Sequence, residues 1–272
     1  MVLEITSPNN THVRRVQALQ RSTRRRSREK LMVAEGVRLV QEALASQLPI
    51  AEVFFTADFA ADPEGAALLA IFEERQIRRC QAPEELMRAM SDTETPQGIL
   101  IVLPTPEIPP GPPGFILVPD NIRDPGNLGA MLRTAWATNV SQVWLPPGNV
   151  DVTNPKVVRA GMGAHFYVSM RSVTWEALRE RIASTQVCQV WLAEMREGVP
   201  YSEANWRDNI ALIIGGEAAG AGPEARALAQ RHVYIPMAPG VDSLNAAIAA
   251  AILMFEVARQ QSRLRPERRY TM

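Results

Sequence analysis

Two apolar runs in the last third of the chain each break into a glycine-containing loop. Residues 210–214 lead into Gly215-Gly216-Glu217, and residues 233–237 lead into Pro239-Gly240. Glycine lets a backbone approach a ligand closely, and Glu217 can accept a hydrogen bond from a hydroxyl or pair with an arginine. In open α/β sheets, ligands bind just beyond the strand ends. The two loops therefore indicate the walls of a small-molecule site, and a flexible turn with a surface carboxylate is the structural alternative.

A third polar stretch, Ser243-Leu244-Asn245, precedes an alanine-rich segment with helical character. The sequence predicts that the last helix starts at Ser243, with Ser243 as its N-cap and Asn245 in its first turn. Helix capping is by itself a sufficient explanation for a serine at position 243. The helix has no polar face before Glu256, so we expect it to be buried almost all round, inside its domain or against a second copy of the chain.

A fourth polar stretch, residues 121–129, leads from an apolar run into a helix that contains Asn127 and Arg133. A helix N-terminus with a nearby arginine can hold a phosphate or a carboxylate. Six residues separate Asn127 from Arg133, so they share a helix face only loosely. A capping asparagine and a solvent-facing arginine explain the same pattern equally well. The stretch is not a GxGxxG sequence, so no dinucleotide fingerprint is present.

The elements that must position these loops alternate between strands and helices along the whole chain. This pattern predicts an α/β protein, with a small N-terminal α/β domain at residues 1–103 and a mostly parallel sheet in residues 115–272. Residues 104–114 contain six prolines and form a stiff linker between the two domains. We expect a helix at 8–20 and a basic connector at 21–30.

Charge is unevenly distributed, although the formal net charge is zero. Residues 14–30 carry eight basic residues against Glu29 alone, and Arg forks match phosphate oxygens well. Lys156 and Arg159 share a face of a predicted helix that begins after Asn154. We expect nucleic-acid contacts from this basic arm and phosphate contacts from this helix, although genome composition and a solvated charged face are the alternatives. The predicted nucleic-acid-binding residues are Arg14, Arg15, Arg24, Arg25, Arg26, Arg28, Lys156 and Arg159.

The composition argues against membrane, secreted and metal-binding classes. No apolar run approaches the ~20 residues that a bilayer span needs, and the N-terminus lacks the apolar core of a signal peptide. Cys80 and Cys188 are isolated and the three histidines are scattered, so neither a disulfide framework nor a metal site is expected. These features favour a reducing, cytoplasmic location.

The polar stretches occur in a fixed order with recognisable spacing. They read N-I-R-D-P-G-N-L-G-x-x-x-R-T-A, then G-G-E-x-x-G, then I-P-M-x-x-x-x-x-S-L-N-A-A-x-A-A-A-I. This set resembles the SpoU (TrmH) family of SPOUT-class RNA ribose 2′-O-methyltransferases over residues 115–260. The N-terminal domain is similar to the ribosomal-protein-like RNA-binding domain fused to many rRNA-directed members. One departure is Gly161, which stands where many members have serine.

The resemblance implies a deep trefoil knot, which unaided topology rules would not predict. It also implies a homodimer and S-adenosyl-L-methionine (SAM) as cofactor, with no metal. By correspondence with the family motifs, the cofactor-binding positions are Gly215, Gly216, Ile235, Met237 and Leu244. The catalytic-site positions are Asn127, Arg133, Glu217, Ser243 and Asn245.

The resemblance implies methyl transfer to a ribose 2′-hydroxyl, which must be aligned with the sulfonium and lose its proton. The family's motif-one arginine has been described as the base, but a guanidinium with a pKa above ~12 is a poor proton acceptor. The alternative is that Arg133 clamps a neighbouring phosphate and stabilises the developing oxyanion. The separate N-terminal domain favours rRNA as substrate. The alternatives are the same chemistry on tRNA and a non-catalytic RNA-binding protein.

Overall fold

The computed structural model describes residues 2–262 apart from 112–113, 185–186, 188 and 217–219. Its internal contacts divide the chain into two units. The N-terminal unit comprises Met1–Pro106 together with Asp151–Phe166, and the C-terminal unit comprises Glu107–Val150 and Tyr167–Met272. Residues 151–166 therefore pack in the N-terminal unit, although they lie between two strands of the C-terminal sheet along the chain.

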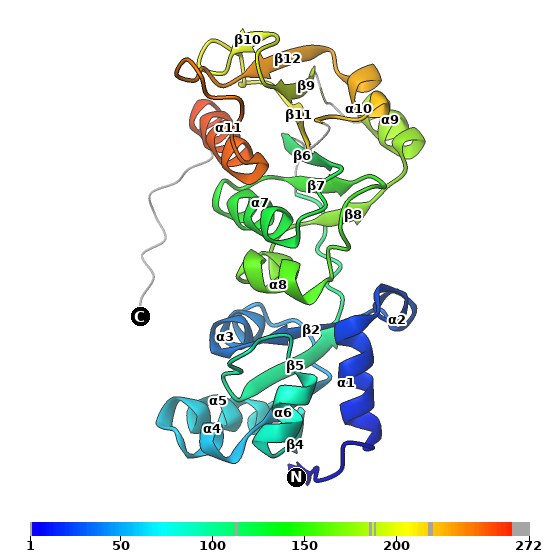
Figure 1. The fold of residues 1–272 in the computed structure, drawn as a ribbon, viewed down its shortest axis with the longest axis vertical. Helices are drawn as coiled ribbons and strands as arrows, with labels where there is room; N and C mark the ends of the chain where they lie inside the picture. The colour runs from blue at the N-terminus through cyan, green and yellow to red at the C-terminus, as the bar shows by residue number, and fades with distance from the viewer. Residues whose placement is uncertain (1, 112–113, 185–186, 188, 217–219, 263–272) are drawn as a thin grey trace. The chain divides into compact units, whose positions relative to one another are not determined.

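A five-stranded mixed sheet forms the centre of the N-terminal unit (Figure 1). The strand pairs β1–β4 and β4–β3 are parallel, whereas β3–β5 and β5–β2 are antiparallel. The short strands β1 and β4 were not anticipated from the sequence. The order across the sheet is β1 (Val2–Glu4), β4 (Arg78–Gln81), β3 (Glu52–Phe55), β5 (Ile99–Pro104) and β2 (Leu31–Glu35).

Apolar side chains cover both faces of this sheet, because successive residues of a strand point to opposite sides. In β2, Met32 and Ala34 pack in one core, and Leu31 and Val33 pack in the other. The first core includes residues of α3 (Val37–Ala45), α5 (Pro63–Glu74) and α8 (Pro155–Gly161). The second includes residues of α1 (Thr11–Arg21) and α6 (Glu84–Met90). The short helix α4 (Ala57–Ala61) precedes α5.

The basic connector expected at 21–30 is largely a helix, which was not predicted from the sequence. Helix α2 (Thr23–Glu29) begins after Ser22, whose side chain accepts a hydrogen bond from the backbone N–H of Arg25. It ends at Lys30, which adopts a left-handed conformation. A run of arginines is compatible with this outcome, because arginine is a good helix former once an N-cap is supplied.

The C-terminal unit contains a seven-stranded sheet in which every strand pair is parallel, which confirms the predicted α/β class. Before the last strand in the sheet order, at Met170–Ser172, the chain forms a 3₁₀ turn at Ala164–Phe166. The order across the sheet is β10 (Val199–Pro200), β12 (Arg231–Tyr234), β9 (Gln189–Glu194), β11 (Ile210–Gly215), β6 (Phe115–Asp120), β7 (Gln142–Leu145) and β8 (Met170–Ser172).

Helices cover both faces of this sheet (Figure 1). Helices α7 (Pro125–Ala137) and α11 (Ala246–Gln260) pack against each other on one side. Helices α9 (Trp175–Ser184) and α10 (Pro223–Leu228) lie on the other side. Leu178 of α9 and Ala225 of α10 share a core with alternate residues of β6, β9 and β11. This is the layered arrangement that near-continuous apolar strands require.

The last helix starts later than expected, and of the two predicted modes of burial the single chain does not supply the wholly internal one. Asn245, not Ser243, is the N-cap of α11, and the first helical residue is Ala246. Ile248 is 53% exposed and Phe255 is 47% exposed, so the helix is not buried all round within one chain. None of the helices in the described part of the chain combines the length and apolarity needed to cross a membrane.

Candidate active site

The polar stretches identified in the sequence follow the carboxyl ends of parallel strands. Residues 121–124 connect β6 to α7, residues after Gly215 connect β11 to α10, and residues 235–245 connect β12 to α11. Strands β6 and β11 are neighbours, with Asp120 and Gly215 in register. Because all these strands are parallel, their carboxyl ends lie at one edge of the sheet, where α/β proteins bind ligands.

A buried aspartate anchors the first loop to the second. Asp120 is 1% exposed and accepts hydrogen bonds from the Gly222 N–H at 2.6 Å and from the Asn121 side chain at 2.9 Å. Burial raises the pKa of Asp120, and the two hydrogen bonds oppose that shift. Sequence reasoning missed this residue. Its signal was a charged side chain that ends an otherwise apolar strand, immediately before the first polar stretch.

Gly215 and Gly216 permit close packing of chain segments. A Cβ on Gly216 would lie 2.4 Å from the carbonyl oxygen of Asn121, and a Cβ on Gly215 would lie 2.5 Å from the backbone nitrogen of Ala221. These contacts involve backbone atoms, so a side chain cannot be accommodated without moving the loop. Close contacts within the protein therefore explain both glycines. Because glycine has no side chain, only peptide groups at these two positions can face a ligand. Glu217, predicted at the catalytic site, lies outside the described residues.

The N-termini of α7 and α11 are joined by a hydrogen bond between two predicted site residues. The side-chain amide of Asn245 donates to Oδ1 of Asn127 at 3.0 Å. Asn245 Oδ1 caps α11 by accepting from the backbone N–H groups of Ala247 and Ile248. Asp124 caps α7 by accepting from the Asn127 N–H at 2.8 Å. The fold therefore brings together Asn127 and Asn245, which belong to the first and third sequence motifs.

Arg133 and Ser243 are exposed and have no hydrogen-bond partner among the described residues. Arg133 lies within α7, and Ser243 lies in the loop before α11. Among the described residues, neither side chain forms a hydrogen bond to the Asn127–Asn245 pair. An exposed guanidinium with no partner in this part of the chain is available to an anionic group, which is a suitable property for a phosphate-binding residue.

The loop between β12 and α11 offers peptide groups to a ligand. Ile235, Met237 and Leu244 are half-buried and lie outside any helix or strand. The peptide groups of Met237 and Leu244 have no hydrogen-bond partner within the part of the chain that the structure describes. Half-buried apolar side chains beside free peptide groups fit an amphipathic cofactor that is held mainly through the backbone.

The basic arm divides into exposed and internally paired arginines. Arg24 and Arg28 are exposed, as is Arg14, whose side chain also donates to Asn9. Arg15 and Arg25 both form ion pairs with Glu29. The exposed arginines can therefore reach a phosphate backbone directly. Arg15 and Arg25 can bind a phosphate only after their ion pairs with Glu29 break.

Arg26 is a structural residue, so its predicted RNA contact is wrong. Its side chain is only 3% exposed and forms an ion pair with Asp151 at 2.5 Å. The guanidinium also donates to Thr153 Oγ1 at 3.1 Å and to the Leu19 carbonyl at 2.6 Å. Burial alone would raise the pKa of Asp151, but the hydrogen bonds from Arg26 and Thr153 outweigh it and lower that pKa. Arg26 therefore fixes the basic helix α2 to residues 151–153.

The other predicted RNA-binding pair lies on α8. Asn154 caps this helix, and Pro155 is in its first turn, as the sequence predicted. Lys156 is exposed, whereas the guanidinium of Arg159 lies 3.4 Å from Asp92. Lys156 is therefore the more accessible cation of the two.

The sequence matches two known families along its length. Residues 114–255 match the SpoU rRNA Methylase family, and residues 10–101 match the MRM3-like substrate binding domain. The chain is 30% identical to the 23S rRNA (guanosine(2553)-2′-O)-methyltransferase RlmP of Bacillus subtilis, over 93% of this chain and 98% of that protein. It is 29% identical to the mitochondrial rRNA methyltransferase 3 of Mus musculus, over 93% of this chain and 73% of the relative.

Solved structures agree with the sequence matches. The AdoMet-bound rRNA methyltransferase of Sinorhizobium meliloti superposes with a TM-score of 0.83 and 28% identity, over 95% of this chain and 98% of the other. Because 95% of this chain is covered, the likeness includes residues of both units. The chain therefore belongs to the SpoU rRNA methylase family of methyltransferases.

Proposed function

We propose that this protein transfers a methyl group from SAM to a ribose 2′-hydroxyl of RNA, with rRNA as the substrate class. The observation that carries the proposal is the hydrogen bond between Asn127 and Asn245, which joins the helices of the first and third motifs at the carboxyl edge of the parallel sheet. The named function of the Bacillus relative and the AdoMet bound to the Sinorhizobium protein support the same reaction.

The cofactor would be held by the loops after β11 and β12. Peptide groups at Gly215, Gly216, Met237 and Leu244, with the side chain of Ile235, suit a ligand that has both polar and apolar parts. When bound, SAM supplies an electrophilic methyl group on a sulfonium. The trefoil knot remains part of this proposal. Gly216 packs closely against the backbone of Asn121. A knotted chain needs such close packing where one segment passes through a loop.

The residues of the chain must orient the ribose hydroxyl and stabilise the charge that develops on its oxygen. We assign this stabilisation to Arg133, because it is exposed and lacks a partner among the described residues. A phosphate next to the target ribose is the natural partner for its guanidinium. Asn127, Ser243 and Asn245 would orient the hydroxyl or Arg133. Glu217 would hold Arg133 or Asn127 in place, as the family motif implies.

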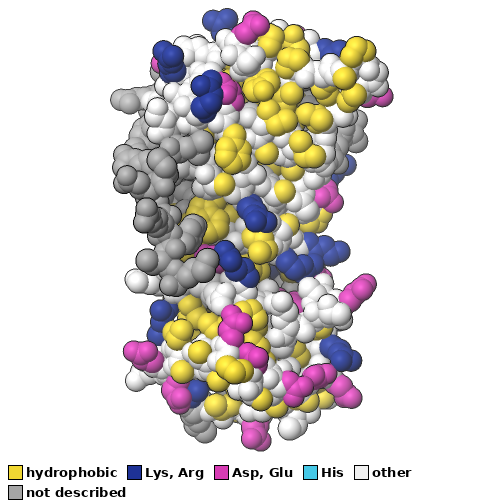
Figure 2. Space-filling model, turned by 90° about the vertical axis from the view of Figure 1, so that its left-hand side faces the viewer, with side chains coloured by type: hydrophobic (Ala, Val, Ile, Leu, Met, Phe, Trp, Pro, Cys, Tyr) yellow, Lys and Arg dark blue, Asp and Glu magenta, His cyan; other side chains and the backbone are white. Residues whose placement is uncertain are grey.

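A homodimer fits the exposed apolar side of α11. Figure 2 shows hydrophobic side chains gathered on the face of the C-terminal unit that carries this helix. Ile248 and Phe255 are separated by two helical turns and lie on one face of α11. Such large exposed apolar side chains mark an interaction surface. In the dimer, Arg133 of one protomer would serve the Asn127–Asn245 site of its partner.

RNA recognition is assigned to the N-terminal unit, whose sequence matches a substrate binding domain. The exposed cations Arg14, Arg24, Arg28 and Lys156 would contact phosphates, and shape would select the target. Two relatives that align over 93% of this chain, and thus over most of both units, are named as rRNA methyltransferases. This match favours rRNA over tRNA.

The decisive experiment is transfer of tritiated methyl groups from SAM to isolated rRNAs and tRNAs, followed by mapping of the modified nucleotide. We expect incorporation into one position of an rRNA, in a nucleotide that resists alkaline hydrolysis at its 3′ side. Incorporation into tRNA alone would establish the tRNA alternative. If the protein binds RNA but neither binds SAM nor transfers methyl groups to any RNA, the non-catalytic alternative is correct.

A further inference from the structure

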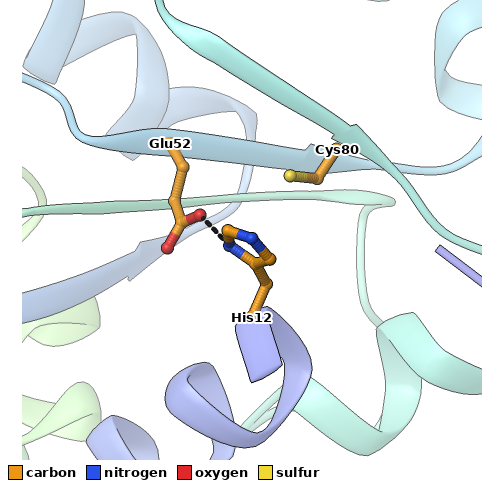
Figure 3. Close-up of side chains that lie close together, drawn as sticks. All are labelled: His12, Glu52 and Cys80. Carbon is orange, nitrogen blue, oxygen red and sulfur yellow. Dashed lines mark hydrogen bonds and ion pairs between the residues drawn. The ribbon is translucent and has the colours of Figure 1, made fainter. Parts of the chain in front are cut away.

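Three side chains with metal-binding atoms meet inside the N-terminal unit, far along the chain from the methylase motifs. His12 comes from the start of α1, Glu52 from β3 and Cys80 from β4, and they point toward one another (Figure 3). One nitrogen, one oxygen and one sulfur atom, a single atom from each residue, all lie within 4.8 Å of one another. The expectation that the chain has no metal site rested on the separation of these residues in the sequence, and folding removes that separation.

The burial of this group gives it an unusual electrostatic character. Glu52 is 1% exposed and Cys80 is 0% exposed, and both lie beside the core formed with α1 and α6. Glu52 Oε2 is bonded to His12 Nδ1 at 2.7 Å, but Oε1 is buried without a hydrogen-bond partner among the described residues. The nearest cationic group to Oε1 is the Arg15 guanidinium at 3.9 Å. A buried, partly satisfied carboxylate is costly unless a cation compensates it.

The cysteine is poorly suited to act as an ordinary reactive thiol. Burial, followed by the neighbouring charge of Glu52, raises the pKa of Cys80 to about 11. A thiol with this pKa remains protonated and unreactive near neutral pH. A bound cation would reverse this state, because a thiol that coordinates a metal loses its proton.

We propose that His12, Glu52 and Cys80 form a binding site for a zinc-class divalent cation. The donor set of one imidazole nitrogen, one carboxylate oxygen and one thiolate sulfur is typical of zinc and cobalt rather than magnesium or calcium. A carboxylate and a thiolate together balance the charge of a divalent ion. Binding forms the metal–sulfur bond and breaks the S–H bond, so the thiol proton is released to the solvent.

The surroundings allow a cation to enter and the ligands to adjust. His12 lines a surface hollow together with Gln76, Ile77 and Arg79, from which a water molecule can supply a fourth ligand. Tetrahedral coordination needs neighbouring ligand atoms about 3.5 Å apart, which requires the His12–Glu52 hydrogen bond to open. The side chain of His12 is 24% exposed, so its ring has room to rotate. The cation would then brace the start of α1 against β3 and β4.

The described residues contain one other group of this kind, which serves as an internal control. Glu194, Glu197 and His232 also lie close together in the C-terminal unit. Glu194 already forms an ion pair with Arg226, and Glu197 is exposed. No thiol is present in this second group, so a sulfur-specific signal distinguishes the two.

The test uses the full-length protein, freed of metal by a chelator and titrated with Co²⁺ and then with Zn²⁺. We expect one equivalent of Co²⁺ to give a thiolate-to-cobalt charge-transfer band that Zn²⁺ abolishes. The Cys80→Ala and His12→Ala variants should lose this band and bind at least about 100-fold more weakly. The matched controls Cys188→Ala, which removes the other cysteine, and His232→Ala, which disables the second group, should retain it.

A second measurement needs only the unaltered chain and guards against a variant that fails to fold. At pH 8, calorimetry in buffers of different ionisation enthalpy should report release of about one proton for each Zn²⁺ bound. The proposal is wrong if the band survives in Cys80→Ala, if it disappears in Cys188→Ala, or if Zn²⁺ at micromolar concentration neither binds nor releases a proton. None of these outcomes depends on methyl transfer.

Discussion

The side-chain amide of Asn245 donates a hydrogen bond to Oδ1 of Asn127, which lies 118 residues earlier in the chain. The same asparagine caps α11 through its own Oδ1. The side-chain oxygen of Asn245 thus caps α11, and its side-chain amide nitrogen contacts the first turn of α7. These two roles can be separated by substitution.

Replacing Asn245 by aspartate should separate capping from catalysis. Asp is as good an N-cap as Asn, so we expect the free energy of unfolding to change by less than about 0.5 kcal/mol. The amide donor is lost and a carboxylate faces Asn127 Oδ1, so methyl transfer should fall by about 10- to 100-fold. Chemical denaturation and single-turnover transfer assays measure the two effects. Asn245→Ala, which removes both functions, should also lose about 1 kcal/mol of stability. An unchanged transfer rate in Asn245→Asp would contradict the assigned role.

Substitution of Arg133 should abolish transfer without affecting folding. The side chain is exposed and has no partner among the described residues, so Arg133→Ala should change stability by no more than about 0.5 kcal/mol. Loss of a group that stabilises the developing oxyanion should lower kcat by about 10²- to 10³-fold. If Arg133 is instead the base, raising the pH should partly restore the activity of Arg133→Ala. A pH-independent defect supports the phosphate clamp, and near-normal transfer would exclude both roles.

Much of the layered architecture was predictable because helix caps and apolar runs are local signals. Asn154 begins α8 as expected, the helix expected at 8–20 forms after Asn10, and the apolar runs at 115–120 and 210–215 form neighbouring parallel strands. The edge strand β1 and its neighbour β4 were missed, because each is only three or four residues long. Strand β4 reads Arg-Arg-Cys-Gln and has no apolar alternation, and it is recognised as a strand through its parallel pairing with β1 and β3.

The errors at the candidate site arise from tertiary contacts that a linear pattern does not contain. Ser243 and Asn245 are both good caps, and the structure shows that Asn245, which also donates to Asn127, begins α11. Arg26 looks like any other arginine of the basic arm, and only the fold provides the acceptors on Asp151, Thr153 and Leu19 that bury it. The burial of the Arg26 side chain therefore could not be predicted from the sequence.

The Arg26–Asp151 ion pair should make a large, pH-dependent contribution to stability. Removing one partner leaves the other buried and uncompensated, so Arg26→Ala should cost about 3–5 kcal/mol. The folded-state pKa of Asp151 is lowered, so this contribution is present above the unfolded pKa of ~3.9 and is lost as the pH falls through the folded value. Chemical denaturation between pH 3 and pH 7 measures this effect. The free energy of unfolding should fall less on acidification in Arg26→Ala than in the unaltered protein. A substitution cost below about 1 kcal/mol at pH 7 would contradict this account.

The exposed arginines of the arm should determine the salt dependence of RNA binding. Each phosphate contact contributes about 0.7–0.9 to the slope of log affinity against log salt concentration. The double variant Arg24→Ala/Arg28→Ala should therefore reduce the magnitude of the slope by about 1.5. Arg88→Ala is a matched control, because Arg88 is exposed in the same unit but lies on α6 and pairs with Glu84. Fluorescence anisotropy from 50 to 300 mM salt gives the slopes, and an unchanged slope in the double variant would rule out the arm.

The exposed face of α11 should mediate dimerisation, and the dimer should share its active sites. Ile248→Glu/Phe255→Glu places two charges on this face and should give a folded monomer in analytical ultracentrifugation. Val199→Glu changes an exposed apolar side chain on β10 and should remain dimeric. If Arg133 serves the partner's site, mixing the impaired Arg133→Ala and Asn245→Asp chains creates heterodimers in which one site has both intact groups. About half of the heterodimer sites should then transfer methyl groups at the normal rate, whereas an arginine that acts within its own chain would leave the mixture no more active than the two variants alone.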